Sequence, residues 1–294
     1  MWKTSPLSVL RNFRPLVMAH RGDSAKVPEN TLPAFQDAYN LHVDCIETDV
    51  RMTQDHQFVF LHDKKLNRTT NITGLVEDFP LAQVQTFDAG FKFKIKENGK
   101  TVFPYRDKGL KIEKVDDIFP QFPNVRFNMD IKTKHPDAPR LLAEKLQQLH
   151  LENRIIVASF HDVQIQRFRA VSAIPTSASP KEVIHFRKVA KNWTKHNRFP
   201  QEPPNISYEE VQKSIFGYIL PFKALQIPEK LVIRVITPAF IQFAHMVGIA
   251  VQVWTINKRD QMEKLLKWGV DGIFSDKPGL LLQVMKDLGH PEKE

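Results

Sequence analysis

The sequence contains a single cysteine, Cys45, among 294 residues. One thiol excludes a disulfide framework and a zinc site built on cysteines, and it is unexceptional for a protein of a reducing compartment. No uninterrupted apolar run is long enough for a transmembrane helix, and the apolar stretch near the N-terminus is too short for a secretory signal peptide. These absences favour a cytoplasmic protein or one that binds a membrane peripherally.

Internal repeats and low-complexity tracts are also absent. Hydrophobic residues make up 42% of the chain, which is enough for a large core and excludes wholesale disorder. The chain has 42 Lys and Arg against 33 Asp and Glu, a net charge of +9. This excess suits an anionic membrane surface or a phosphate-bearing substrate. Because the basic residues are dispersed and no nucleic-acid-binding motif occurs, a nucleic-acid partner is not expected.

Short β-like runs alternate with helical patterns along most of the chain. The expected strands are Leu16–Ala19, Cys45–Val50, Phe58–Leu61, Val125–Ile131, Arg154–Phe160, Ile174–Ala178, Ile219–Ile227, Ala250–Ile256 and Gly272–Ser275. The expected helices begin at the N-cap Asn30-Thr31 and then cover Pro139–Leu149, Asp162–Val171, Lys181–Trp193, Pro238–Val247, Asp260–Trp268 and Pro278–Leu288. Repeated βα units imply parallel strands with right-handed crossovers.

This pattern predicts an α/β fold, a TIM-like (β/α)8 barrel that forms one domain over residues 1–294. An open doubly wound sheet is the alternative. The alternation fades over residues 64–107, which we interpret as an insertion after an early strand, and 194–204 is polar and Pro-bearing, as in a loop.

Carboxylates occur inside a run that should be buried. In Cys45-Ile46-Glu47-Thr48-Asp49-Val50, the strand period of two places Glu47 and Asp49 on one face. Two buried carboxylates repel each other unless a cation lies between them. The pair therefore indicates one hard divalent cation, Mg²⁺ or Ca²⁺. A solvated strand end paired with Lys or Arg is the alternative.

A second run repeats this arrangement. In Phe127-Asn128-Met129-Asp130-Ile131-Lys132, the three polar residues share one face of the strand. An inward Lys132 beside carboxylates is either half of a structural salt bridge or a cation that binds phosphate, and the sequence does not choose between them.

Polar and aromatic side chains also mark the ends of other strands. His20 and His62 each directly follow an apolar run, which places them at the carboxyl ends of strands, the catalytic rim of a barrel. A lone histidine there is more often a surface residue, but two beside a carboxylate pair suit acid–base chemistry on a phosphoester. Trp254 alternates with apolar neighbours and points inward, either as core filler or as part of a site.

One late region has two interpretations. The run Ile215–Phe222 fits a buried strand or an element that dips into a membrane. The basic segment Lys181–Arg198 precedes it. Together they form either a lid or membrane-facing edge, as a lysophospholipid substrate would need, or a solvated basic helix followed by an ordinary strand.

Several motifs together match a known pattern in order along nearly the whole chain. They are His20-Arg21-Gly22, Glu29-Asn30-Thr31, Ile46-Glu47-Thr48-Asp49-Val50, Val59-Phe60-Leu61-His62-Asp63, Leu66-Asn67-Arg68-Thr69-Thr70, Asp130-Ile131-Lys132, Ser159-Phe160, Trp254-Thr255-Ile256-Asn257 and Gly269–Pro278. In these residues the chain resembles the glycerophosphodiester phosphodiesterase family. The combined N-terminal pattern is specific, although no single triplet in it would be.

The resemblance implies a TIM-like barrel with one divalent metal ion that cleaves a phosphodiester bearing a glycerol or a similar alcohol. By position, His20 and His62 match the acid–base histidines, and Arg21 and Lys132 match residues near the phosphate. Glu47 and Asp49 then match metal-binding carboxylates. Trp254 matches an aromatic residue that lines the substrate mouth.

The third metal carboxylate departs from the family pattern. In the family it usually lies just before a helix, and here the matching stretch is Ile112–Phe119. Asp117 aligns best, with Asp116 and Glu113 as alternatives.

The expected products are an alcohol and a phosphomonoester, either glycerol 3-phosphate or lysophosphatidic acid. The alternatives are a sphingomyelinase D-like or phospholipase C-like cleavage that gives a cyclic phosphate, and a barrel without catalysis that binds phosphates or membranes. Which histidine is the acid and which the base is left open.

Overall fold

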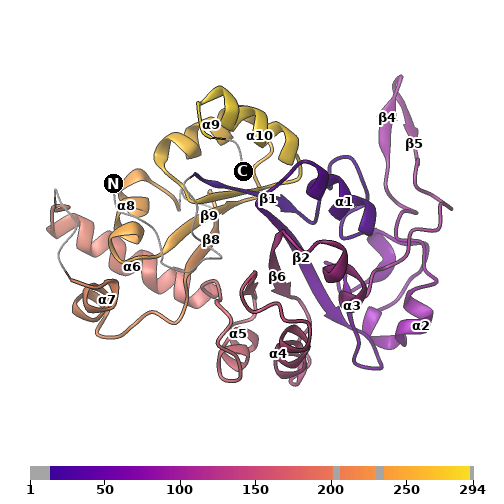
Figure 1. The fold of residues 1–294 in the computed structure, drawn as a ribbon, viewed down its shortest axis with the longest axis horizontal. Helices are drawn as coiled ribbons and strands as arrows, with labels where there is room; N and C mark the ends of the chain where they lie inside the picture. The colour runs from indigo at the N-terminus through magenta and orange to yellow at the C-terminus, as the bar shows by residue number, and fades with distance from the viewer. Residues whose placement is uncertain (1–13, 201–205, 230–234, 292–294) are drawn as a thin grey trace.

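The computed structural model describes residues 14–200, 206–229 and 235–291. Seven parallel strands form a curled sheet in the order β7-β6-β2-β1-β10-β9-β8 (Figure 1). Their bounds are β1 Leu16–His20, β2 Cys45–Met52, β6 Arg126–Ile131, β7 Ile155–Ala158, β8 Ala224–Pro228, β9 Ala250–Trp254 and β10 Gly272–Ser275. The expectation that the N-terminus is no secretory signal peptide concerns residues 1–13, which lie outside the described residues.

The segment 175–178 joins the two edges of this sheet. Thr176 forms a parallel bridge with Val157 of β7, and Ser177 forms one with Ala224 of β8. These are single-residue bridges rather than the regular strand expected for Ile174–Ala178. They nevertheless bring the first and last strands of the sheet together, and the predicted α/β barrel is confirmed.

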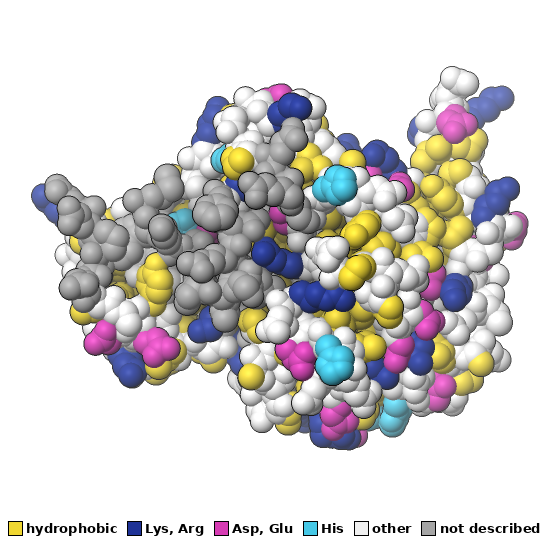
Figure 2. Space-filling model, in the orientation of Figure 1, with side chains coloured by type: hydrophobic (Ala, Val, Ile, Leu, Met, Phe, Trp, Pro, Cys, Tyr) yellow, Lys and Arg dark blue, Asp and Glu magenta, His cyan; other side chains and the backbone are white. Residues whose placement is uncertain are grey.

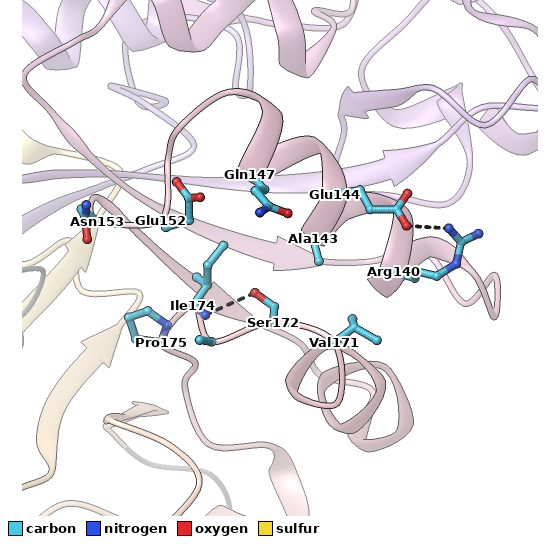
Figure 3. A pocket seen from close by; sticks show the side chains of 11 residues that line it. Arg140, Ala143, Glu144, Gln147, Glu152, Asn153, Val171, Ser172, Ile174 and Pro175 are labelled. Atoms are coloured by element: carbon cyan, nitrogen blue, oxygen red, sulfur yellow. Dashed lines mark hydrogen bonds and ion pairs between the residues drawn. The ribbon is translucent and has the colours of Figure 1, made fainter.

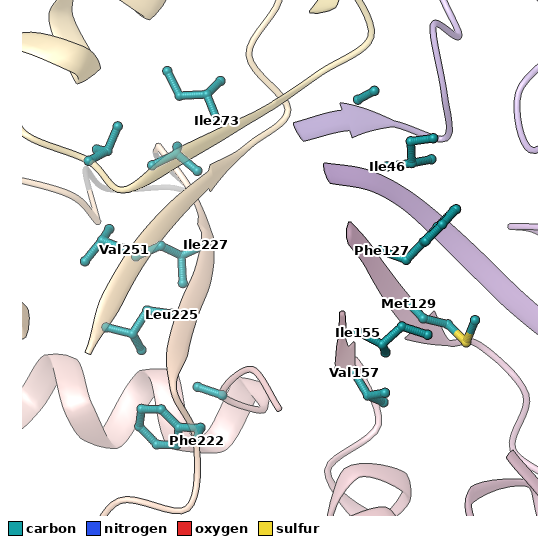
Figure 4. Close-up of a cluster of buried hydrophobic side chains, with 14 of the residues drawn as sticks. Ile46, Phe127, Met129, Ile155, Val157, Phe222, Leu225, Ile227, Val251 and Ile273 are labelled. Carbon is teal, nitrogen blue, oxygen red and sulfur yellow. The ribbon is translucent and has the colours of Figure 1, made fainter. Parts of the chain in front are cut away.

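Helices cover the outside of the curled sheet (Figure 1). The longer ones are α1 Leu32–Asn40, α4 Ala138–Gln148, α5 Asp162–Arg169, α6 Pro180–His196, α7 Tyr208–Phe216, α8 Pro238–Met246, α9 Arg259–Trp268 and α10 Pro278–Asp287. Apolar side chains on the outer face of the strands, such as Ile46, Phe127 and Val251, are fully buried beneath them (Figure 4). Within the described residues, no helix has both the length and the hydropathy needed to cross a bilayer.

The strand period of two therefore divides the barrel into an apolar outer layer and a partly polar interior. Inside, the Gln226 amide donates to Asn128 Oδ1 at 2.5 Å and to Gln252 Oε1 at 2.9 Å. These three amides come from β6, β8 and β9, so they tie distant strands together across the interior.

Residues 64–107 follow β3 Phe58–Phe60, which runs antiparallel to β2 and is not one of the parallel strands. They contain two 3₁₀ turns, Leu66–Arg68 and Val76–Asp78, the short helix α2 Leu81–Val84 and the hairpin β4 Ile95–Glu97 with β5 Lys100–Val102. This hairpin projects from the body of the molecule, with hydrophobic side chains along its base (Figure 2). A separate buried cluster that includes Leu66, Val76 and Val84 packs the segment against β3.

The run Ile215–Phe222 is not a strand, and that interpretation was wrong. Helix α7 extends through Phe216 and ends at Gly217, whose φ of +82° forms a left-handed cap. β8 begins only at Ala224, so the expected strand from Ile219 starts five residues too early. Glycine after a helical pattern is the local signal that distinguishes this helix end from a strand.

The basic segment is a helix of the barrel's outer layer. Phe186 of α6 packs against Phe240 and Phe243 of α8, with ring centroids 5.7 and 5.4 Å apart. The helix continues through His196, into the expected loop, whose residues 201–204 lie outside the described residues. The chain after α7 enters the amino end of β8, so Ile215–Phe222 does not cover the carboxyl ends of the strands.

Candidate active site

The strand register brings the predicted site residues to the same end of the barrel. His20, the last residue of β1, pairs with Glu47 of β2. Two residues farther along β2, Asp49 pairs with Asp130 of β6. Because all these strands are parallel, their side chains converge on the carboxyl-terminal rim, where barrel enzymes carry their active sites.

The turn after His20 requires glycine at its second position. Gly22 has a φ of +86°, and a Cβ atom there would lie 2.6 Å from the backbone of Ala34 in α1. The backbone of Asp23 donates to the same Ala34 carbonyl at 3.0 Å. This close approach fixes where the chain leaves β1, and hence the orientation of His20 and Arg21.

His20 is held by a carboxylate that the sequence did not single out. Its Nδ1 lies 2.6 Å from Asp276 Oδ1, and Asn257 Nδ2 donates to the other Asp276 oxygen at 2.6 Å. Since an ionised carboxylate only accepts hydrogen bonds, Nδ1 carries the proton and Nε2 is left facing Glu47, 3.9 Å from its Oε2. Burial disfavours the charged ring, but Glu47 and Asp276 outweigh it and raise the pKa of His20.

His62 follows β3 and is held in the same way. Its Nδ1 lies 2.6 Å from Asp63 Oδ1, which leaves its Nε2 as the free ring nitrogen. Burial lowers the pKa of His62, and the positive charge of Arg21 adds to this against the opposing effect of Asp49. The two imidazoles thus have opposite shifts, as suits a pair in which one accepts and the other donates a proton.

The basic side chains lie against the carboxylates. Arg21 Nε is 3.0 Å from Asp49 Oδ2, and Lys132 Nζ is 3.2 Å from Asp49 Oδ1 and 2.7 Å from Asp130 Oδ2. Lys132 therefore forms the ion pairs of the salt-bridge interpretation, and phosphate binding by Lys132 stays a prediction. Asn30 completes the surroundings of Asp49, since its Nδ2 donates to Asp49 Oδ2 at 2.9 Å.

Negative charge is crowded at the centre of this cluster. Burial, followed by the charge of Asp49, raises the pKa of Glu47 to about 7. Burial acts in the same direction on Asp49, but Lys132 and Arg21 outweigh it and lower the pKa of that carboxyl. Asp130 is buried like Glu47, and its pKa is raised chiefly by that burial.

The donor set fits a hard divalent cation. Glu47, Asp49 and Asp130 are buried carboxylates on two neighbouring strands, and Asp130 Oδ1 has no hydrogen-bond donor. Asp49 Oδ1 likewise has only the ion-pair contact with Lys132 and no hydrogen bond. As the side chains stand, no three carboxylates or imidazoles in the described parts of the chain are arranged to hold a metal ion. Oxygen ligands and a local excess of negative charge are nevertheless what Mg²⁺ and Ca²⁺ require.

The predicted third carboxylate does not join this cluster. Asp117 is exposed on the short helix α3 Val115–Ile118, and Asp116 beside it pairs with Lys145 of α4 at 2.6 Å. Glu113 is buried, but its backbone carbonyl bonds to Phe60 and its carboxylate accepts from the backbone of Leu32. The carboxylate that lies in register with Asp49 is Asp130, which the sequence placed on the inward face, and Asp117 stays a prediction from the family pattern.

Trp254 lies at the end of β9, half-buried above the interior. Its indole contacts the ring of Phe160 edge-on, with centroids 5.5 Å apart, and Phe160 is 53% exposed. Lys132 Nζ lies 4.8 Å from the centre of the Phe160 ring. An apolar surface thus borders the cationic part of the site.

A surface groove lies away from this cluster. It has a volume of about 650 Å³ and runs between α4 and the chain after α5 (Figure 3). Its lining includes the exposed ion pair of Arg140 with Glu144, and Asn153, which precedes β7. This is the amino-terminal side of the barrel, away from both histidines.

The sequence model of the glycerophosphoryl diester phosphodiesterase family matches residues 20–280. A glycerophosphodiester phosphodiesterase of Caldanaerobacter subterraneus subsp. tengcongensis is 28% identical over 282 residues, which cover 94% of this chain and 100% of the relative. Lysophospholipase D GDPD1 of Homo sapiens is 22% identical over 272 residues, 89% of this chain and 83% of that protein.

Solved structures share the fold. An Oleispira antarctica phosphodiesterase, solved in complex with the product sn-glycerol-3-phosphate, superposes with a TM-score of 0.67 and 22% identity. The match covers 93% of this chain and 98% of the other. At this identity the likeness shows that the two proteins share the barrel fold and nothing more.

Proposed function

Because this chain belongs to the glycerophosphoryl diester phosphodiesterase family, we propose that it hydrolyses glycerophosphodiesters to an alcohol and glycerol 3-phosphate. One observation carries the proposal. His20 and His62, each held through Nδ1 by a carboxylate at 2.6 Å, lie in one cluster with Arg21 and Lys132. Two oriented imidazoles beside two fixed cations are what phosphodiester cleavage requires.

The chain's own residues divide the chemistry between them. Arg21 and Lys132 stabilise negative charge on the non-bridging phosphate oxygens as the phosphorus centre is attacked. One histidine takes a proton from the attacking water, whose oxygen bonds to phosphorus, and the other donates a proton to the departing alkoxide oxygen, so that the P–O bond breaks to a neutral alcohol. Asp276 and Asp63 keep each Nε2 available for these transfers.

A divalent cation is part of the proposal. Glu47, Asp49 and Asp130 would hold Mg²⁺ or Ca²⁺, whereas the family resemblance implies Asp117 in place of Asp130. When bound, the cation polarises the phosphate and neutralises its charge. The cyclic phosphate products and the barrel without catalysis are weaker alternatives, the latter because both histidines are present and oriented.

The second question is whether the substrate is a water-soluble diester or a lysophospholipid with an acyl chain. The segment 215–222 leads into the amino end of β8, so it does not form a lid over the rim. Exposed Phe160 against Trp254 is the observation that favours a lysophospholipid, since it offers apolar surface beside Lys132. We favour the water-soluble diester, with lysophospholipase D cleavage as the second candidate.

Head-group release decides between these substrates. With purified protein and Mg²⁺ or Ca²⁺, choline release from glycerophosphocholine is expected to exceed that from lysophosphatidylcholine by at least about tenfold in kcat/KM, a transition-state difference of about 1.4 kcal/mol. The reverse order would assign lysophospholipase D activity. Release of choline from neither substrate, with either cation, would reject the proposed function.

We also propose that α6 makes the peripheral membrane contact. Phe186 and Ala190 on its inner face are buried, while its outer face carries four exposed lysines, Lys181, Lys188, Lys191 and Lys195. None of the four forms an ion pair with a described residue, and the one acidic residue of the helix, Glu182, pairs with Arg169 at 2.6 Å. Such a face is complementary to an anionic lipid surface.

Removal of these lysines tests the contact. Each lysine near an anionic surface contributes about 1 kcal/mol, so replacing all four by Gln is expected to weaken sedimentation with phosphatidylserine-containing vesicles at least about tenfold. Hydrolysis of glycerophosphocholine should be unchanged. A control with Lys94, Lys100, Lys108 and Lys267 replaced by Gln makes the same change in net charge elsewhere. Equal loss in both variants would mean that no particular face binds lipid.

A further inference from the structure

Arg68 forms ion pairs with two carboxylates at the candidate site, Asp63 and Glu29. It ends the 3₁₀ turn Leu66–Arg68, the first turn after β3 within residues 64–107. Its Nε donates to Asp63 Oδ2 at 2.5 Å, and its Nη1 and Nη2 donate to Glu29 Oε2 and Oε1, each at 2.7 Å. One guanidinium thus holds two carboxylates from different parts of the chain.

Each of these carboxylates also contacts a residue to which we assign a role in the reaction. Asp63 uses its other oxygen to hold His62 Nδ1 at 2.6 Å. Glu29 Oε1 also accepts from Arg21 Nη1 at 2.9 Å. Arg68 therefore holds two carboxylates, one of which contacts His62 while the other contacts Arg21.

On the basis of these contacts, and resting on the proposed function, we propose that Arg68 is a positioning residue for both His62 and Arg21. Through Asp63 it fixes the tautomer and ring orientation of His62. Through Glu29 it fixes the guanidinium of Arg21 beside Asp49. The segment 64–107 then belongs to the catalytic unit, because it supplies this residue.

The geometry explains why arginine is needed. A planar guanidinium can satisfy one carboxylate through two parallel hydrogen bonds and a second one through Nε, whereas a lysine ammonium has no such fork. Burial acts to raise the pKa of Asp63, but the hydrogen bonds from Arg68 and His62 outweigh it and bring that pKa to about 2. Asp63 thus stays ionised and accepts a hydrogen bond from the Nδ1–H of His62.

A merely structural role is the competing explanation. The Arg68 side chain is 45% exposed, and ion pairs at such positions contribute little to folding stability. Arg106 provides a matched control in the same segment. It stacks on the rings of Phe91 and Phe103 at 4.4 and 3.8 Å and contacts neither Asp63 nor Glu29.

Kinetics of five variants test the proposal with glycerophosphocholine as the probe. Arg68→Met is expected to lower kcat/KM by about 10–100-fold, the usual effect of losing a residue that orients a functional group, with an unchanged melting temperature. Asp63→Asn should act mainly on kcat through His62, Glu29→Gln mainly on KM through Arg21, and Arg68→Met on both. Arg106→Met should leave kcat and KM unchanged. Arg68→Lys should recover part of the loss.

A second readout does not depend on turnover. In long-range ¹H–¹⁵N spectra of the imidazoles, His62 is expected to occupy the Nδ1–H tautomer in the unmodified protein and in Arg106→Met, and to lose that preference in Arg68→Met. If the protein hydrolyses no phosphodiester, the proposed function fails, while this spectrum still decides the role of Arg68. An unchanged His62 tautomer, or kinetic losses equal in Arg68→Met and Arg106→Met, would overturn the proposal.

Discussion

Replacing His20 with alanine is expected to lower kcat by about 10²–10⁴-fold, the usual contribution of a positioned acid or base. His20 is the last residue of β1, and its ring is fixed between Asp276 and Glu47. The variant keeps the cationic side chains of Arg21 and Lys132, so KM should change little. Choline release from glycerophosphocholine by the purified variant, with circular dichroism to verify folding, gives the measurement.

His245 offers a closely matched control for this substitution. Its Nε2 lies 2.8 Å from Asp271 Oδ2, and its side chain is 16% exposed against 18% for His20. His245 lies on α8 and Asp271 immediately precedes β10, so the pair is at the amino end of that strand. In the variant, Asp271 retains a hydrogen bond from the backbone of Val251. His245→Ala should therefore leave kcat unchanged. A kcat for His20→Ala within about tenfold of the unmodified protein would contradict the mechanism.

Replacing Asp130 with asparagine is expected to weaken cation binding strongly and to lower turnover with it. Asp130 lies in register with Asp49, and its Oδ1 is buried without a hydrogen-bond donor. Loss of a charged oxygen ligand should weaken Mg²⁺ or Ca²⁺ binding by at least about 100-fold, more than the loss of a residue that merely supports a ligand. Titration calorimetry with each cation measures this directly.

Thermal unfolding gives a readout of the same prediction without substrate. A cation that binds only the folded state raises the melting temperature, so the unmodified protein should be stabilised by added cation and Asp130→Asn should not. Asp117→Asn is the control, because Asp117 is exposed on α3. If Asp117→Asn lost cation binding while Asp130→Asn kept it, the ligand set inferred from the family pattern would be right and the one inferred from the structure wrong.

The parts of the fold that follow local periodicity were predictable from the sequence. The strand period of two gives the inward face of β2 directly, so Glu47 and Asp49 could be placed together without a structure. His20 could be placed at the rim because it ends an apolar run that forms a parallel strand. His62 lies near the same rim for another reason, since the antiparallel β3 pairs with the carboxyl end of β2. The antiparallel direction of β3 could not be read, since direction depends on the partner strand and not on the strand's own pattern.

Contacts between distant segments account for what the sequence missed. The pairing of Asp49 with Asp130 depends on the register of β2 against β6, which no local pattern encodes. Asp276 and Arg68 lie within motifs that carried the resemblance, but their partners are side chains 256 and 39 residues away. The strand prediction for Ile215–Phe222 was wrong for a different reason, because the apolar pattern of a short run fits a strand and a helix end equally well.

The antiparallel strand β3 also bears on how such a protein can change over evolutionary time. β3 pairs with β2 through three residues and is not part of the path of parallel strands. Residues gained or lost in the segment that follows it therefore leave the register of every parallel strand intact. Lengthening or shortening this one segment beyond its first turn is therefore expected to alter the surface beside His62 while the seven parallel strands keep their pairing.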